Sequence, residues 1–124
     1  MSKTFFVLGA LFSFLGVALG AFGAHALKQK LTLDALQIFE TGVRYQMYHA
    51  FGLFAAAWVI HTWNVGSAAA SGWLFTAGII LFSGSLYAIA LSGITWFGMI
   101  TPLGGICFLL GWGLLGWNVW RAAL

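Results

Sequence analysis

Four apolar stretches, separated by short polar segments, occupy most of the chain. They cover residues 5–26, 46–63, 72–91 and 98–120. A helix rises 1.5 Å per residue, so roughly 20 residues cross the ~30 Å hydrocarbon layer of a bilayer, and each stretch has about that length. The pattern predicts an all-α membrane protein, in which a four-transmembrane-helix antiparallel bundle forms a single integral membrane domain over residues 1–124.

Residues 32–45, between the first two stretches, follow a different pattern. Leu36 and Phe39 recur at helical spacing on one side, whereas Glu40 and Arg44 fall on another. Such an amphipathic segment is typical of a helix that lies along the membrane surface. We therefore expect an amphipathic interfacial helix between spans one and two, which can continue directly into the second span.

The first stretch also imitates a secretory signal peptide. Lys3 precedes an apolar core, and residues 24–26 form a small-x-small triplet like a cleavage site. The apolar stretch is longer, however, than the core of about 7–15 residues in a typical signal peptide. We therefore expect the stretch to remain in the protein as a membrane span.

Composition and charge narrow the classes of partner. Hydrophobic residues make up 62% of the chain and charged residues 6%, too few charges for a soluble domain to cover its apolar side chains. The net charge of +3 comes from scattered basic residues, whereas nucleic-acid binding needs a dense basic face. The single cysteine, Cys107, excludes an intrachain disulfide and a thiolate metal cluster. The lipid bilayer is the predicted partner, and the near balance of basic residues on its two sides leaves the orientation open.

Small residues predict how the helices pack. In the first span they recur every three or four positions, at Gly9, Ser13, Gly16, Gly20 and Ala24. Such stripes let helix backbones approach closely in lipid. They fit packing inside the bundle and also self-association, so a homo-oligomer or a larger membrane complex stays open as a partner.

Polar side chains at the predicted membrane depth form the candidate polar site. Its members are His25, Glu40, Arg44, Tyr48, His49, Ser83, Ser85 and Tyr87. Ionisable groups in membrane segments are costly and usually face a bundle interior or a watery cavity, so this cluster is a better candidate than the interfacial tryptophans. Glu40 and Arg44 are one turn apart in the favoured order and are expected to form an ion pair.

Two histidines lie next to the connection between the first two spans. His25 ends the first span and His49 begins the second, so an antiparallel hairpin would bring the two imidazoles to similar depth. They can bond to the backbone or to Tyr45, titrate in a proton path, or ligate a b-type haem from two helices. We expect the first of these uses, with no metal and no resident cofactor. Because the sequence has no nucleophile beside a base, no carboxylate pair and no phosphate-binding loop, we also expect that the protein is not an enzyme.

Four segments that contain these polar residues resemble a known family. They are GAFGAH at residues 20–25, ETGVRYQMYH at 40–49, FSGSLY at 82–87 and TPLGG at 101–105. In order and spacing they resemble the small bacterial inner-membrane family catalogued as domain of unknown function 423, which is similar to the eukaryotic transmembrane protein 256 group. The resemblance implies a multi-pass protein with four helices in the bacterial inner (plasma) membrane and with termini on the cytoplasmic side. It implies no particular activity.

Three functions from different classes remain. The leading hypothesis is a non-enzymatic structural or accessory membrane protein, because short loops and helix-packing glycines dominate the sequence. The second is a small transporter or channel, which would need an oligomer because four thin helices enclose little space. The third is a haem- or quinone-binding membrane protein.

Overall fold

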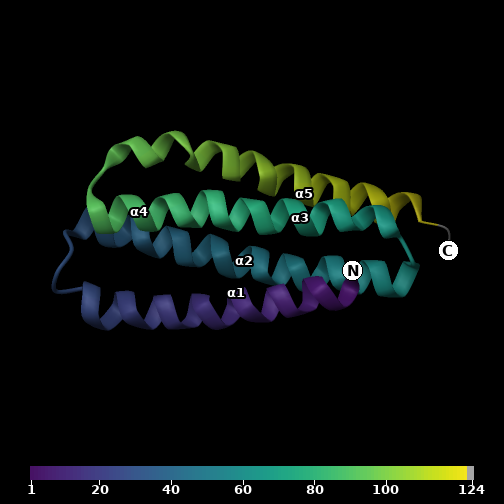
Figure 1. Cartoon of the computed structure of the whole chain (residues 1–124), viewed down its shortest axis with the longest axis horizontal. Coiled ribbons are helices and arrows are strands. Elements are labelled where there is room, and N and C mark those ends of the chain that lie inside the picture. The colour runs from purple at the N-terminus through teal and green to yellow at the C-terminus, as the bar shows by residue number, and fades with distance from the viewer. Residues whose placement is uncertain (123–124) are drawn as a thin grey trace.

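The computed structural model describes residues 1–122, and the regular elements in that part of the chain are all helical. The α-helices are α1 (Ser2–Phe22), α2 (Leu33–Trp63), α3 (Ala69–Gly78), α4 (Gly84–Ser92) and α5 (Thr101–Arg121). A π-helical turn, Gly23–Leu27, extends α1, and a second one, Ile79–Ser83, joins α3 to α4 in one continuous rod. The described part of the chain therefore folds into four long helical rods (Figure 1).

Three of the rods are long and apolar enough to cross a membrane. They are Ser2–Leu27, Gly66–Ser92 and Thr95–Arg121, and they contain the first, third and fourth apolar stretches. The remaining rod, α2, has 31 residues, but polar side chains such as Gln46 and His49 lower its mean hydropathy. The structure thus agrees with a membrane protein that has several candidate spans.

Residues 33–63 form the single helix α2, so the amphipathic segment continues directly into the second apolar stretch, an arrangement that the sequence left open. Thr32 caps the start of α2, where its side-chain oxygen accepts a hydrogen bond from the N–H of Ala35 at 3.2 Å. No proline interrupts the helix. Phe39 and Gly42 are buried, so the apolar side of the amphipathic pattern packs against other helices of the protein.

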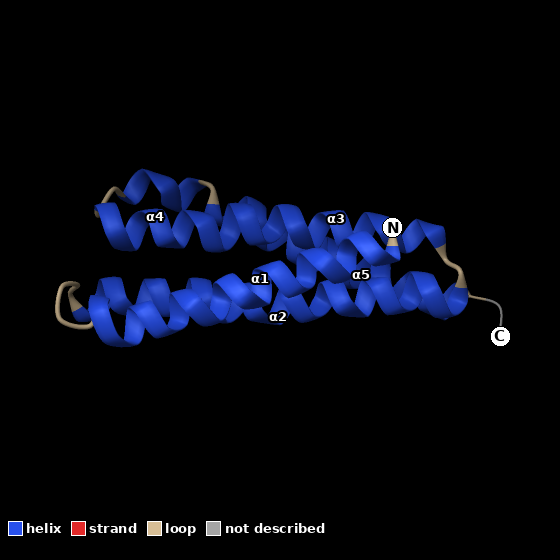
Figure 2. Ribbon diagram, turned by 60° about the horizontal axis from the view of Figure 1, so that its bottom comes forward, coloured by secondary structure: helices blue, strands red, loops and turns tan. Residues whose placement is uncertain are grey.

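The four rods lie side by side in the order α1, α2, α3 with α4, and α5 (Figure 1). α1 packs chiefly on α2, α5 packs chiefly on α3 and the turn after it, and α2 contacts the α3–α4 rod between them. α1 and α5 lie on opposite sides of the central pair formed by α2 and the α3–α4 rod, and each also contacts the second member of that pair, α1 at α3 and α5 at α2. Short loops join the rods near their ends, and α1 begins at the same end of the molecule at which α5 finishes (Figure 2).

Aromatic rings seated on glycines join neighbouring rods. A Cβ atom placed on Gly72 of α3 would lie 2.5 Å from Cζ of Phe5 in α1, so only glycine leaves room for that ring. The same arrangement recurs with Phe39 on Gly23, Phe75 on Gly111 and Phe108 on Gly78. All four phenylalanines are buried. Each glycine thus provides a shallow seat on one helix for a ring from another.

The small-residue stripe of the first span packs inside the protein. Gly9 approaches α2 so closely that an added Cβ would lie 2.9 Å from the carbonyl oxygen of Ala50. Two further glycines on the stripe meet α2 as well, Gly16 at Met47 and Gly20 at Val43. Packing within the chain, one of the two uses predicted for the stripe, is therefore present. These pairs also define the antiparallel register of α1 against α2.

Candidate functional site

Gln46 of α2 is the centre of a hydrogen-bond network between three rods. Its Nε2 donates to the backbone carbonyl oxygen of Phe12 in α1 at 2.8 Å. Its Oε1 accepts from the hydroxyl of Tyr87 in α4 at 2.7 Å. The amide is 3% exposed, so both bonds lie in a largely apolar interior, where an unpartnered amide would be costly.

Two buried serines extend the network. Ser83 Oγ donates to the carbonyl oxygen of Gly42 in α2 at 2.6 Å. Ser85 Oγ donates to the carbonyl oxygen of Phe82 at 2.8 Å and shares a second hydrogen bond, of 2.6 Å, with Thr101 Oγ1. The α3–α4 rod is thereby tied to α2 on one side and to the start of α5 on the other.

His49 lies one turn beyond Gln46, and one of its two ring nitrogens forms a hydrogen bond within the protein. Nδ1 is 2.6 Å from the carbonyl oxygen of Tyr45, and since a carbonyl only accepts, Nδ1 carries the proton. The imidazole stacks on Phe108 of α5, with ring centroids 3.4 Å apart and planes inclined by 8°. This bonding defines the neutral tautomer and leaves Nε2 as an acceptor.

The His49 ring opens onto a groove of about 690 Å³ between α2 and α5. Aromatic and small apolar side chains line the groove, namely Tyr45, Tyr48, His49, Phe82, Pro102, Gly105, Ile106, Phe108, Leu109 and Trp112. Its lining comes from α2, from α5 and from Phe82 in the turn between α3 and α4, and it includes the stacked rings of His49 and Phe108. We refer to it as the His49 groove.

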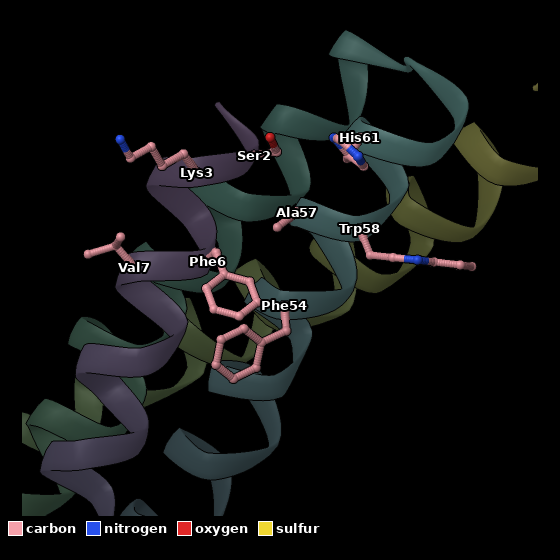
Figure 3. A pocket seen from close by; sticks show the side chains of 8 residues that line it. All are labelled: Ser2, Lys3, Phe6, Val7, Phe54, Ala57, Trp58 and His61. Atoms are coloured by element: carbon pink, nitrogen blue, oxygen red, sulfur yellow. The ribbon is translucent and has the colours of Figure 1, made fainter.

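Two other hollows are apolar. One, of about 470 Å³, lies between α1 and the α3–α4 rod and has Gln46 and Tyr87 at its wall. The other, of about 380 Å³, lies between the start of α1 and the end of α2, where the rings of Phe6 and Phe54 meet at 4.7 Å (Figure 3). The side chain of Lys3 extends away from His61 there, so the two polar residues do not converge on a common site (Figure 3).

His25 and His49 do not lie at similar depth, contrary to the sequence-based expectation. Because Gly16 faces Met47 and Gly20 faces Val43, the register carries His25 about 11 residues, or roughly 16 Å, beyond the level of His49. His25 is exposed in the π-helical turn, whereas His49 is buried. The two imidazoles therefore do not fit as the paired axial ligands of one haem.

The expected ion pair between Glu40 and Arg44 is also wrong. Both residues are exposed on α2, and no bond joins their side chains in the described part of the chain. An exposed pair gains little free energy and loses side-chain entropy when it forms, which explains why the favoured spacing is not sufficient.

The predicted site residues therefore separate into three groups. Tyr48 and His49 line the groove, whereas Ser83, Ser85 and Tyr87 bond neighbouring helices. His25, Glu40 and Arg44 form the third group, which is exposed. Within residues 1–122, no three side chains of His, Cys, Asp or Glu gather as metal ligands would.

Sequence reasoning missed Gln46, the most connected residue of the network. The available signal was a single uncharged amide within an apolar span, three residues from His49 and four from Gly42. Gln46 is not ionisable, but an amide buried in a membrane needs hydrogen-bond partners just as a charge does.

Comparison with known proteins agrees with the helical architecture and identifies the family. The family pattern described as "Protein of unknown function (DUF423)" matches residues 19–105, a range that includes all four segments on which the resemblance was based. The chain belongs to the DUF423 family. Its relatives are named membrane proteins, and no activity is established for them.

Relatives from several bacteria match this DUF423 protein over nearly its whole length. It is 50% identical over 111 residues to the UPF0382 membrane protein YwdK of Bacillus subtilis, which covers 89% of this chain and 90% of YwdK. It is 45% identical over 113 residues to the UPF0382 membrane protein SSP2132 of Staphylococcus saprophyticus, with coverage of 91% and 93%. A UPF0382 membrane protein of Haemophilus influenzae is 40% identical over 123 residues, 98% of each chain. No solved structure matches the chain.

Replacing Gln46 by leucine should destabilise this DUF423 protein, because the Phe12 carbonyl and the Tyr87 hydroxyl lose their shared partner. From bonds of this kind in membranes we expect a loss of about 1–2 kcal/mol in the free energy of unfolding. The loss should be non-additive with Tyr87→Phe in a double-mutant cycle in detergent micelles. Gln37→Leu, on an exposed position of the same helix, is the matched control. Equal effects of Gln46→Leu and Gln37→Leu would contradict the network.

Proposed function

We propose that this DUF423 protein is a four-span structural or accessory protein of the bacterial inner membrane, and that it is not an enzyme. The observation that carries the proposal is how its buried polar side chains are used. Gln46, Ser83 and Tyr87 direct their hydrogen bonds to neighbouring helices. Groups committed in this way stabilise helix packing, and they are not free to carry a proton or bind a substrate.

The distribution of tryptophans supports α2 as the fourth span. The packing registers bring Trp58 of α2 level with Trp117 of α5 and with Phe5 of α1, toward the end at which the chain begins. Tryptophans at a common level are typical of a membrane interface. Counting about 20 residues along each rod from that level covers residues 5–25, 38–58, 70–90 and 97–117.

This placement accounts for the charged residues of α2. Glu40 and Arg44 then lie within two turns of the interface opposite the tryptophans. Both are exposed, and the long side chain of Arg44 can reach the headgroup region while its stem covers apolar surface.

An accessory role needs surfaces that contact lipid or a larger membrane complex. The outer flanks of the protein, which are the outward faces of α1 and α5, provide such surfaces. Phe14 on α1 is 73% exposed and Leu109 on α5 is 75% exposed, and large apolar side chains surround both. Because α1 and α5 lie on opposite sides of the central helices, one flank can contact lipid while the other packs against a second copy or a larger complex. The bacterial relatives are named membrane proteins, which supports a location in a membrane.

The four-span arrangement predicts that the loops at the two ends of the α3–α4 rod lie on opposite sides of the membrane. Ser67→Cys and Ser92→Cys, each in a Cys107→Ser background, add one exposed thiol at either end. A membrane-impermeant maleimide should label one variant in right-side-out vesicles and the other in inside-out vesicles. Labelling of both from the same side would contradict the arrangement.

The structural role predicts that the purified protein moves no solute by itself. Liposomes that contain it should show proton and sodium fluxes equal to those of protein-free liposomes, measured with entrapped dyes. Mild detergent extracts of native membranes should show a larger particle than the purified chain does. Saturable flux through the purified protein would overturn the proposal in favour of an oligomeric transporter or channel.

A further inference from the structure

Among the buried side chains that line the His49 groove, His49 has a ring nitrogen that the fold does not use. His49 Nε2 has no hydrogen-bond partner among residues 1–122, although the side chain is 5% exposed. In this part of the chain, the unpartnered polar atoms that are fully enclosed belong to Ser13 and Ser71, so Nε2 reaches the open space of the groove. A lone pair in an apolar groove is a recognition point for a hydrogen-bond donor.

The wall around this nitrogen is aromatic. Tyr45 packs on Phe82 with ring centroids 4.8 Å apart, and His49 stacks on Phe108 at 3.4 Å. Trp112 lies 5.8 Å from the His49 ring and continues the wall along α5. Rings of this kind favour a planar aromatic partner, which packs against them by stacked or edge-to-face contact.

The groove continues past the rings along an apolar track. Ile106 and Leu109 of α5 line this part and are both exposed. Gly105 has open space beside it, because the only atom within 4 Å of an added Cβ would be Phe82 Cδ2, at 4.0 Å. The space therefore accommodates an apolar chain next to a ring.

We propose that the His49 groove binds a membrane-soluble quinol, that is, a hydroxylated aromatic ring on an apolar tail. The quinol hydroxyl donates to His49 Nε2, the ring lies against the aromatic wall, and the tail follows Ile106 and Leu109. A lipid acyl chain has no donor for the nitrogen, and the carbonyls of an oxidised quinone only accept. At His49 Nε2 the reduced form is therefore favoured over the oxidised form.

This inference uses the four-span placement, which brings His49 close to the middle of the bilayer, where apolar quinols dissolve. It does not depend on the accessory role. The labelling of Ser67→Cys and Ser92→Cys tests the placement separately, so a failure of the topology and a failure of quinol binding can be told apart.

The test is isothermal titration of the purified full chain in detergent micelles with decylubiquinol, under anaerobic conditions. We expect saturable binding of the quinol and at least ten-fold weaker binding of decylubiquinone. His49→Phe, which keeps a stacked ring but removes the acceptor, should weaken quinol binding by at least ten-fold. His61→Phe is the matched control and should bind as the wild type does.

A second pair of variants tests the groove without touching His49. Gly105→Leu should fill the track and abolish binding, whereas Gly113→Leu, on a part of α5 where an added Cβ meets nothing, should not affect it. Thermal unfolding of each variant checks that it is folded. Equal affinities for quinol and quinone, unchanged binding by Gly105→Leu, or equally tight binding of decylbenzene, which has a ring and tail but no hydroxyl, would each overturn the proposal.

Discussion

Contact between aromatic rings and glycines holds these helices together. In lipid, apolar surface gains little from leaving its surroundings, so helix association depends on van der Waals contact and hydrogen bonds. Van der Waals attraction falls steeply when a gap opens, and a ring seated directly on a glycine avoids that gap. Phe5 on Gly72 links α1 to α3, and Phe75 on Gly111 and Phe108 on Gly78 link α3 to α5.

The hydrogen bonds and the groove follow from this packing. Tyr87 lies so close to α2 that a Cβ on Gly42 would be 2.8 Å from its Cε1, and this approach brings its hydroxyl to Gln46. Likewise, Phe108 is seated on α3 and also stacks on His49, so the ring that joins two helices forms part of the groove wall.

The sequence predicts the helices and the family well because both depend on local signals. Span length, short loops and the four segments are all readable along the chain. Partners and register are not, since periodicity shows which face of a helix is apolar but not what covers it. For this reason the sequence leaves open whether residues 32–45 form a separate helix, and it wrongly predicts that His25 lies level with His49 and that Glu40 pairs with Arg44. Gln46 was missed because its importance comes from Phe12 and Tyr87, which are distant in sequence.

The most direct test of the account compares Gly78→Ala with Gly113→Ala by their free energies of unfolding in micelles or bicelles. An added methyl group on Gly78 collides with the Phe108 ring, whereas one on Gly113 meets nothing within 4 Å. We predict that Gly78→Ala loses about 1–3 kcal/mol through overpacking. Gly113→Ala should keep its stability or gain up to about 1 kcal/mol from better helix propensity. Equal effects of the two substitutions would contradict the seating of rings on glycines as the basis of the fold.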